Sequence, residues 1–205
     1  MVLINNTSDK EPDLEMTGGV PMVYARESSS KEWHIHIDGD IGGPDQYRGL
    51  HPVLESAEED DRVYVHITSQ GGNIVSAIKV SGWLRLCKAR TISVLEGEVC
   101  SAATIIALST DDVAVMPHSY MMFHPASYNC GGEQANISRY VDFVDEYLMN
   151  VFEDYYEGFL TEEEILDMVE TSKDIWMGEA EIMQRLKNRA DIFKENGEKE
   201  GEVDD

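Results

Sequence analysis

Apolar and polar residues follow two periods along this chain, and their succession predicts an α/β fold. A half-buried strand is indicated by alternation at 33–37, and a buried strand is indicated by the short apolar run at 91–95. Further strands are predicted at 62–67 and 113–116. Between them, apolar residues at helical spacing or runs of small residues occur at 45–56, 74–86 and 102–108. Because strands alternate with helices in this order, we expect a largely parallel sheet with helices on its faces.

The second half of the chain is dominated by one long amphipathic segment. Residues 133–158 carry an apolar stripe over about 25 residues, roughly twice the mean length of a helix in a globular protein. A helix of about 35 Å projects beyond a small domain, so we expect this one to pack against another copy of the chain. Around it lie a strand-like segment at 120–123, a capping-box helix at 161–170, a short apolar run at 175–177 and a last helix at 178–186.

Length and composition favour one folded domain between two polar ends. The chain has 205 residues, of which 42% are hydrophobic, and this is enough to bury a substantial core. Residues 1–30 are polar and contain glycine and serine clusters, so they are predicted to form a flexible arm. The domain is expected at 31–192, and the acidic segment 193–205 is predicted to be a disordered tail.

Charge and cysteine content narrow the classes of partner. Forty acidic residues against sixteen basic ones give a net charge of −24, which disfavours nucleic acid and anionic membranes as ligands. The chain has no apolar run long enough for a membrane span, no signal-peptide pattern at its start, and three cysteines without a recognisable spacing. We therefore expect a cytoplasmic protein that needs no cofactor.

Two histidines of the strand at 33–37 are the first candidates for a metal site. His34 and His36 fall on one face of that strand. A pair of imidazoles needs further ligands, and no third ligand has a recognisable spacing from them. The sequence therefore predicts solvent-facing strand histidines and no metal site.

Ser101 lies where the strand at 91–95 gives way, after Gly97, to the helix at 102–108. A serine in this position commonly caps the helix by accepting a hydrogen bond from its first amides. The same unpaired amides can stabilise an oxyanion beside a nucleophilic hydroxyl, so the position alone leaves both roles open. Cys100 is a rival nucleophile, but one residue earlier in the turn it is expected to point elsewhere and to pack as a small residue.

Four short motifs, in a fixed order along the chain, point to one protein family. They are Thr68-Ser69-Gln70-Gly71-Gly72, Gly97-x-x-x-Ser101, Met122-Phe123-His124-Pro125 and Lys173-Asp174-x-x-Met177. Together they resemble the proteolytic subunit of Clp protease (ClpP), a self-compartmentalising serine peptidase, over about residues 62–180. The resemblance implies a ClpP/crotonase-type α/β fold, built of β-α-β superhelical units with a projecting handle helix at 133–158.

The resemblance also implies a catalytic triad. Ser101 matches the nucleophile, His124 the general base and Asp174 the carboxylate that orients the imidazole. These residue types suit the roles, because a serine hydroxyl needs a base in hydrogen-bond reach and histidine titrates near neutral pH. The carboxylate fixes the histidine tautomer and stabilises the imidazolium as it forms.

The remaining implied site residues lie on either side of the triad. The backbone amides of Gly71 and Ala102 match the oxyanion hole, and glycine at 71 lets a substrate carbonyl approach the backbone closely. A strand-shaped substrate groove is implied between Gly71, Gly72 and Asn73 on one side and Cys130 and Gly131 on the other. A peptide that adds there as an extra strand is bound through its backbone, which tolerates many sequences.

The family further implies an assembly and its partners. A ClpP-type subunit forms a homo-oligomeric ring of seven subunits, which can stack as a 14-mer through the handle helix. An ATP-dependent AAA+ unfoldase feeds such rings, so the implied substrates are unfolded proteins and short peptides.

Several alternatives share the fold. A phage-type head-maturation protease and a catalytically idle ClpP-like structural subunit are both compatible with the motifs, although the presence of all three triad residue types argues against an idle subunit. A crotonase-type acyl-CoA enzyme uses backbone oxyanion donors without a triad. A Ser–Lys dyad would need Lys88 or Lys173 beside Ser101 and would leave His124 without a role.

Overall fold

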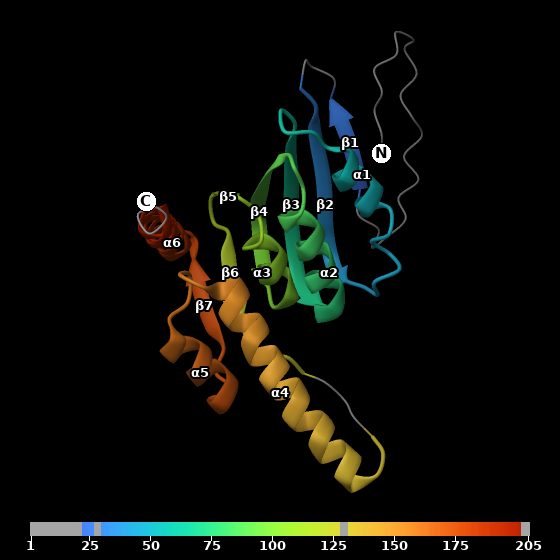
Figure 1. Ribbon diagram of the computed structural model, residues 1–205, viewed down its shortest axis with the longest axis vertical. Helices are drawn as coiled ribbons and strands as arrows, with labels where there is room; N and C mark the ends of the chain where they lie inside the picture. The colour runs from blue at the N-terminus through green and yellow to red at the C-terminus, as the bar shows by residue number, and fades with distance from the viewer. Residues whose placement is uncertain (1–21, 27–29, 128–130, 202–205) are drawn as a thin grey trace. The chain divides into compact units, whose positions relative to one another are not determined.

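The computed structural model describes residues 22–26, 30–127 and 131–201. The chain divides into two compact units, residues 1–121 and 122–205, which are described separately (Figure 1). The expected arm at 1–30 lies mostly outside the described residues. The domain limits expected at 31–192 stay a prediction.

The first unit is built on a largely parallel sheet, as the alternation of elements predicts. Its strands are β1 (Met22–Arg26), β2 (Glu32–Ile41), β3 (Arg62–Gly72), β4 (Arg90–Cys100) and β5 (Asp112–Val115). They are ordered β1-β2-β3-β4 with β5 beside β4, and only β1 runs antiparallel to its neighbour. The mixed α/β class expected from the sequence is therefore confirmed.

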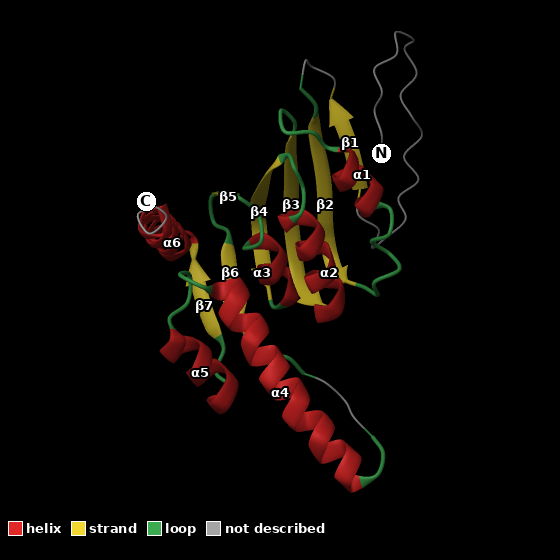
Figure 2. Ribbon diagram, viewed as in Figure 1, coloured by secondary structure: helices red, strands yellow, loops and turns green. Residues whose placement is uncertain are grey.

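Three helices cover one face of this sheet. They are α1 (Leu50–Ser56), α2 (Ile74–Arg85) and α3 (Ala102–Ala107), and Figure 2 shows them on the same side of the strands. On β3, Val63, Val65 and Ile67 point to this side and are fully buried, whereas the alternate residues on the other face are half-buried. Burying aliphatic side chains along the middle strands supplies most of the stabilisation of this unit.

The second unit is mainly helical. The division between the units falls within β6 (Tyr120–Phe123), and α4 (Gln134–Tyr156), α5 (Glu162–Thr171), β7 (Ile175–Gly178) and α6 (Glu179–Gly201) follow. Its core is aromatic: Phe123 meets Tyr156 edge-on, and Phe152 stacks on Tyr156. None of the helices that the structure describes is long and apolar enough to cross a membrane.

The elements differ from the sequence expectations mainly at their ends. The capping box that starts α5 is confirmed, with Thr161 and Glu164 bonding each other's backbone amides. The last helix continues from Glu179 to Gly201, well past the expected end at 186 and into the segment expected to be a tail. Charged and polar residues with good helix propensity support this extension, and at its start Gln184 donates an i,i+4 hydrogen bond to Asn188 over 2.9 Å.

Candidate active site

Ser101 occupies a strained turn between β4 and α3. Its backbone angles are φ 56° and ψ −130°, a combination that a residue with a side chain rarely adopts. Although Ser101 is the N-cap residue of α3, its side chain makes no capping hydrogen bond. Strain of this kind is typical of functional positions, since surrounding contacts must hold it in place. The hydroxyl of Ser101 is therefore not used for capping the helix.

The strained turn lies directly against the end of β3. A Cβ atom built on Gly71 would lie 2.5 Å from Ser101 Cβ, 2.7 Å from the carbonyl oxygen of Cys100 and 3.1 Å from Ala102 N. Gly71 also has φ +101°, so both the space and the backbone conformation require glycine. The structure thus brings together three of the residues expected at the site, namely Ser101, Gly71 and Ala102.

The two amides expected to stabilise an oxyanion are in different states. Ala102 is the first residue of α3, so its N–H has no acceptor within the helix. The N–H of Gly71 donates to Ser69 Oγ over 3.0 Å, and this hydroxyl in turn donates to the carbonyl oxygen of Gly39 over 2.6 Å. A substrate oxygen at Gly71 would have to replace the Ser69 hydroxyl as acceptor. Ser69 is fully buried, and although it belongs to one of the sequence motifs, the sequence analysis assigned it no role at the site.

The neighbouring residues expected in the groove have structural roles of their own. A Cβ on Gly72 would lie 2.4 Å from the carbonyl oxygen of Ile41, so this glycine allows β3 to approach β2. Asn73 caps α2, because its side chain accepts the N–H of Ser76 over 2.9 Å. The Cys100 thiol is buried, as expected for a small packed residue, and burial keeps a thiol unreactive.

The other two residues of the expected triad belong to the second unit. His124 directly follows β6 and is half-buried, and Asp174 directly precedes β7 and is exposed. Ser172 ends α5 in a left-handed conformation, with φ 55°, and so turns the chain into the segment that carries Asp174. Since Ser101 lies in the first unit, the triad stays a prediction. Cys130 lies outside the described residues, and Gly131 is exposed.

Lys173, the lysine beside Asp174, is engaged elsewhere. Its Nζ donates to the carboxylate of Asp167 over 2.6 Å. This ion pair raises the pKa of Lys173, whereas a lysine that acts as a general base needs a lowered pKa. The interaction argues against a Ser–Lys dyad built on Lys173.

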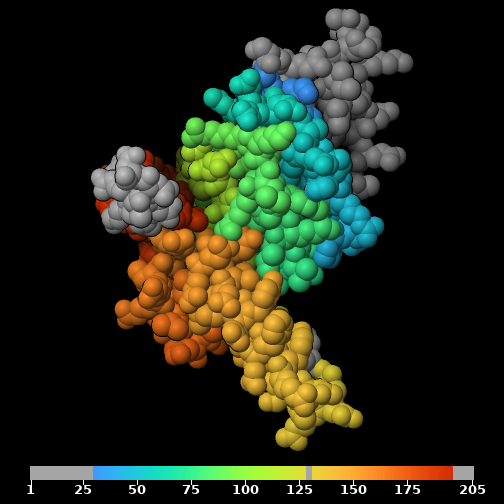
Figure 3. All heavy atoms as spheres, viewed as in Figure 1, coloured from blue at the N-terminus to red at the C-terminus, as the bar shows by residue number. Residues whose placement is uncertain are grey.

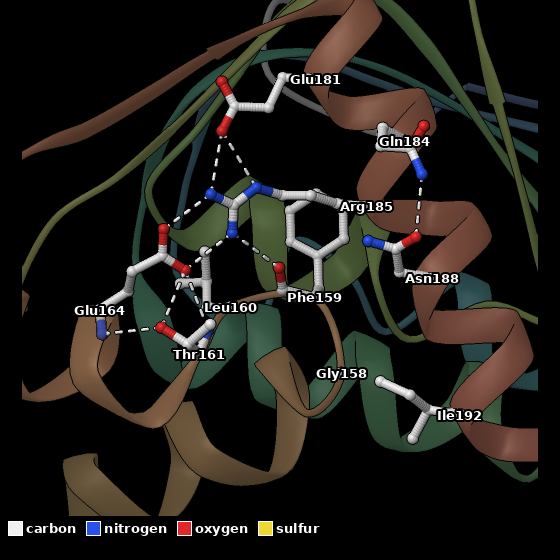
Figure 4. Close-up of a pocket in the computed structure, with 10 residues that line it drawn as sticks. All are labelled: Gly158, Phe159, Leu160, Thr161, Glu164, Glu181, Gln184, Arg185, Asn188 and Ile192. Carbon is white, nitrogen blue, oxygen red and sulfur yellow. Dashed lines mark hydrogen bonds and ion pairs between the residues drawn. The ribbon is translucent and has the colours of Figure 1, made fainter.

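A pocket of about 560 Å³ lies within the second unit (Figure 4). Arg185 at its centre donates to both carboxylate oxygens of Glu164 over 2.7 Å each, to Glu181 over 2.9 Å and to the carbonyl oxygen of Phe159. Hydrogen bonds from Arg185 lower the pKa of Glu164 to about 2. Because the charges are already paired and no histidine, serine or cysteine lines the pocket, we interpret it as a structural junction between α5 and α6.

Comparisons with known proteins gave a family match and a related protein. The chain matches the model of the Clp protease family over residues 49–185, a range that includes Gly71, Ser101, His124 and Asp174. It is also 26% identical over 148 residues to the ATP-dependent Clp protease proteolytic subunit 2 of Treponema denticola. That alignment covers 68% of this chain and 74% of the Treponema protein.

Proposed function

This chain belongs to the Clp protease family, and we propose that it is a serine endopeptidase with Ser101, His124 and Asp174 as its triad. Family membership makes it a ClpP-type peptidase; the residue roles are the proposal. The observation that carries it is the Ser101 turn, which is strained, packed against Gly71 and not used for capping. A purely structural serine has no need of such a conformation.

In the proposed reaction, Ser101 Oγ attacks the carbonyl carbon of the scissile peptide bond. His124 takes the hydroxyl proton and then delivers it to the leaving amine, which departs as the acyl-enzyme forms. Asp174 accepts a hydrogen bond from the imidazole and stabilises its protonated form. Water, activated by His124, then hydrolyses the ester and regenerates Ser101.

The negative oxygen of the tetrahedral intermediate needs preorganised donors. We assign the N–H of Ala102 as the first donor, because it has no partner within α3. The N–H of Gly71 is the second, and it becomes available when the substrate oxygen replaces Ser69 Oγ. The edge formed by Gly71, Gly72 and Asn73, together with Cys130 and Gly131, would bind an extended peptide through its backbone.

The long helix α4 supports an oligomeric setting for this chemistry. All of its buried residues lie in the C-terminal part, from Leu148 onward. The N-terminal part is exposed, with Tyr140 at 48%, Phe143 at 65% and Tyr147 at 42%, and Figure 3 shows it in yellow, extending beyond the rest of the second unit. Exposed aromatic side chains of this size are typical of a protein interface. We propose that this helix joins two heptameric rings, which an ATP-dependent unfoldase supplies with polypeptide.

A fluorophosphonate probe tests the proposal directly, because it reacts with activated serines. We expect a single adduct on Ser101, located by mass spectrometry, that is lost in Ser101→Ala and in His124→Ala. Peptide hydrolysis should fall by a factor of about 10³ or more in Ser101→Ala. The variant Cys100→Ala is the control and should be labelled like the wild type. Full peptidase activity in Ser101→Ala would contradict the assignment.

A further inference from the structure

Three histidines and one glutamate meet on the half-buried face of the sheet in the first unit, away from the helices. His34 and His36 lie on β2, His66 on β3 and Glu96 on β4. The parallel register pairs His36 directly with His66, and both side chains project from the same face. The histidines expected to face solvent are thus in contact with a third histidine, His66, about 30 residues further along the chain, and His66 in turn contacts the carboxylate of Glu96.

His66 lies at the centre of the cluster and contacts each of the other three side chains. His66 Nδ1 lies 2.7 Å from Glu96 Oε1, and His66 Nε2 lies 2.9 Å from His34 Nδ1. The rings of His36 and His66 stack with their centroids 4.5 Å apart. Among His36, His66 and Glu96, one ligand atom from each residue lies within 4.8 Å of the other two.

We propose that His36, His66 and Glu96 bind a divalent transition-metal ion, with zinc as the best fit to the ligand set. Two imidazole nitrogens and one carboxylate oxygen are ligands that zinc accepts, and a water molecule can complete a tetrahedron. Bonds of about 2.0–2.1 Å place tetrahedral ligands about 3.3 Å apart. The ligand atoms now lie within 4.8 Å of one another, and the stacked rings of His36 and His66 would have to turn so that one nitrogen of each points at the ion.

The surroundings suit such an ion. His34 contacts the ring of His66 from the side opposite Glu96, and a hydrogen bond in such a place orients a metal-binding imidazole. The side chains of His66 and Glu96 are 15% and 38% exposed, so an ion can reach them from solvent.

The position of the cluster gives metal binding a consequence for the proposed active site. His66 lies five residues before Gly71 on β3, and Glu96 lies five residues before Ser101 on β4. An ion held by both residues and by His36 would tie together β2, β3 and β4 just ahead of the strained turn. The inference itself rests on this cluster alone and holds whether or not Ser101 is a nucleophile.

Metal titration of the purified, untagged protein tests the proposal. The protein is first treated with a chelator and then titrated calorimetrically with Zn²⁺ in the presence of excess Mg²⁺, which occupies nonspecific carboxylate sites on this acidic chain. Co²⁺ serves as the spectroscopic probe, because its visible absorption reports imidazole ligation and coordination number. The variants are His66→Gln and Glu96→Gln, and the control is His51→Gln, a histidine that lies against Trp83 outside the cluster.

We expect one Zn²⁺ per chain, with affinity reduced at least tenfold in Glu96→Gln, reduced further in His66→Gln and unchanged in His51→Gln. Zinc at about 100 times its dissociation constant should raise the melting temperature by roughly 5–10 °C in the wild type and much less in Glu96→Gln. Glu96→Gln keeps the shape of the side chain, so it decides the matter if His66→Gln does not fold. Zinc binding that is undetectable in the wild type, or equally tight in both cluster variants, would overturn the proposal.

Discussion

The contact between Gly71 and the Ser101 turn predicts a specific effect of adding one methyl group. In Gly71→Ala, the new Cβ would meet Ser101 Cβ at 2.5 Å and the carbonyl oxygen of Cys100 at 2.7 Å. Both distances are well below ordinary carbon contacts, and the second involves backbone that cannot rotate away. Gly97 is a matched control, because it has φ +100° against +101° for Gly71 but nothing within 4 Å of the position of a Cβ.

The comparison separates two costs. A side chain at positive φ costs about 1–2 kcal/mol, and this applies equally to Gly71→Ala and Gly97→Ala. Forcing a methyl group into filled space costs about 1–3 kcal/mol more, and this applies only to Gly71→Ala. We therefore expect the free energy of unfolding to fall by about 2–5 kcal/mol in Gly71→Ala and by about 1–2 kcal/mol in Gly97→Ala.

Unfolding in urea measures the stabilities, and the rate of fluorophosphonate labelling measures the reactivity of Ser101. Because the clash pushes directly on Ser101, labelling should slow by about 100-fold in Gly71→Ala, as expected for a displacement approaching 1 Å. In Gly97→Ala the rate should stay within a few fold of the wild type. Equal stabilities and equal labelling rates for the two variants would refute the close approach of β3 to the Ser101 turn.

Two further predictions concern the second unit. Arg185 holds the pKa of Glu164 at about 2, below its ordinary 4.5. The contribution of this ion pair to the stability of the fold is therefore full above about pH 4.5 and is lost as the pH falls toward 2. Glu164→Gln keeps a capping side chain but should lower the free energy of unfolding at pH 7 by about 1 kcal/mol, a small amount because a partly exposed ion pair is screened. The melting temperature of this variant should also depend less on pH between about pH 5 and 2 than that of the wild type. An equal pH dependence in the two proteins would contradict this prediction. In α4, Phe143→Glu should lower the oligomer mass measured by light scattering. The control variant Arg139→Glu changes a polar position on the same helix and should leave the mass unchanged. Equal masses for the wild type and Phe143→Glu would argue against an interface at Phe143.

The sequence predicted the first unit well because its middle strands are buried by helices on one face. At 62–67 the alternating aliphatic residues Val63, Val65 and Ile67 are the buried ones, so pattern and structure agree. The length of α6 was not predicted, because beyond residue 186 the segment lacks a strong apolar stripe and forms its helix from charged and polar residues with good helix propensity.

The candidate site shows the same difference between local and long-range information. Ser101 was identified from its motif, but its strain and the contact with Gly71 depend on how β3 and β4 end side by side. Ser69 was not identified, since its hydrogen bond to the Gly71 amide follows from the conformation of the turn. The histidine cluster was missed because no sequence spacing joins His36 to His66 and Glu96; only the strand register does.

An irregularity in β4 lets one strand serve both the cluster and the strained turn. Between paired residues, β3 advances from Ile67 to Ser69 while β4 advances from Leu95 to Val99, so β4 carries two extra residues. Two extra residues are an even number, so the alternation of faces is kept across the irregularity, and Leu95 and Val99 are both buried. Glu96 lies on the half-buried face by the ordinary alternation of β4 and contacts His66 there. After the irregular segment, in which Gly97 has φ +100°, β4 pairs again at Val99 and leads to Ser101 against Gly71. Because Glu96 lies within this irregular segment and Ser101 follows its end, a change in the length of the segment would disturb both sites, whereas side-chain substitutions such as Glu96→Gln change only one.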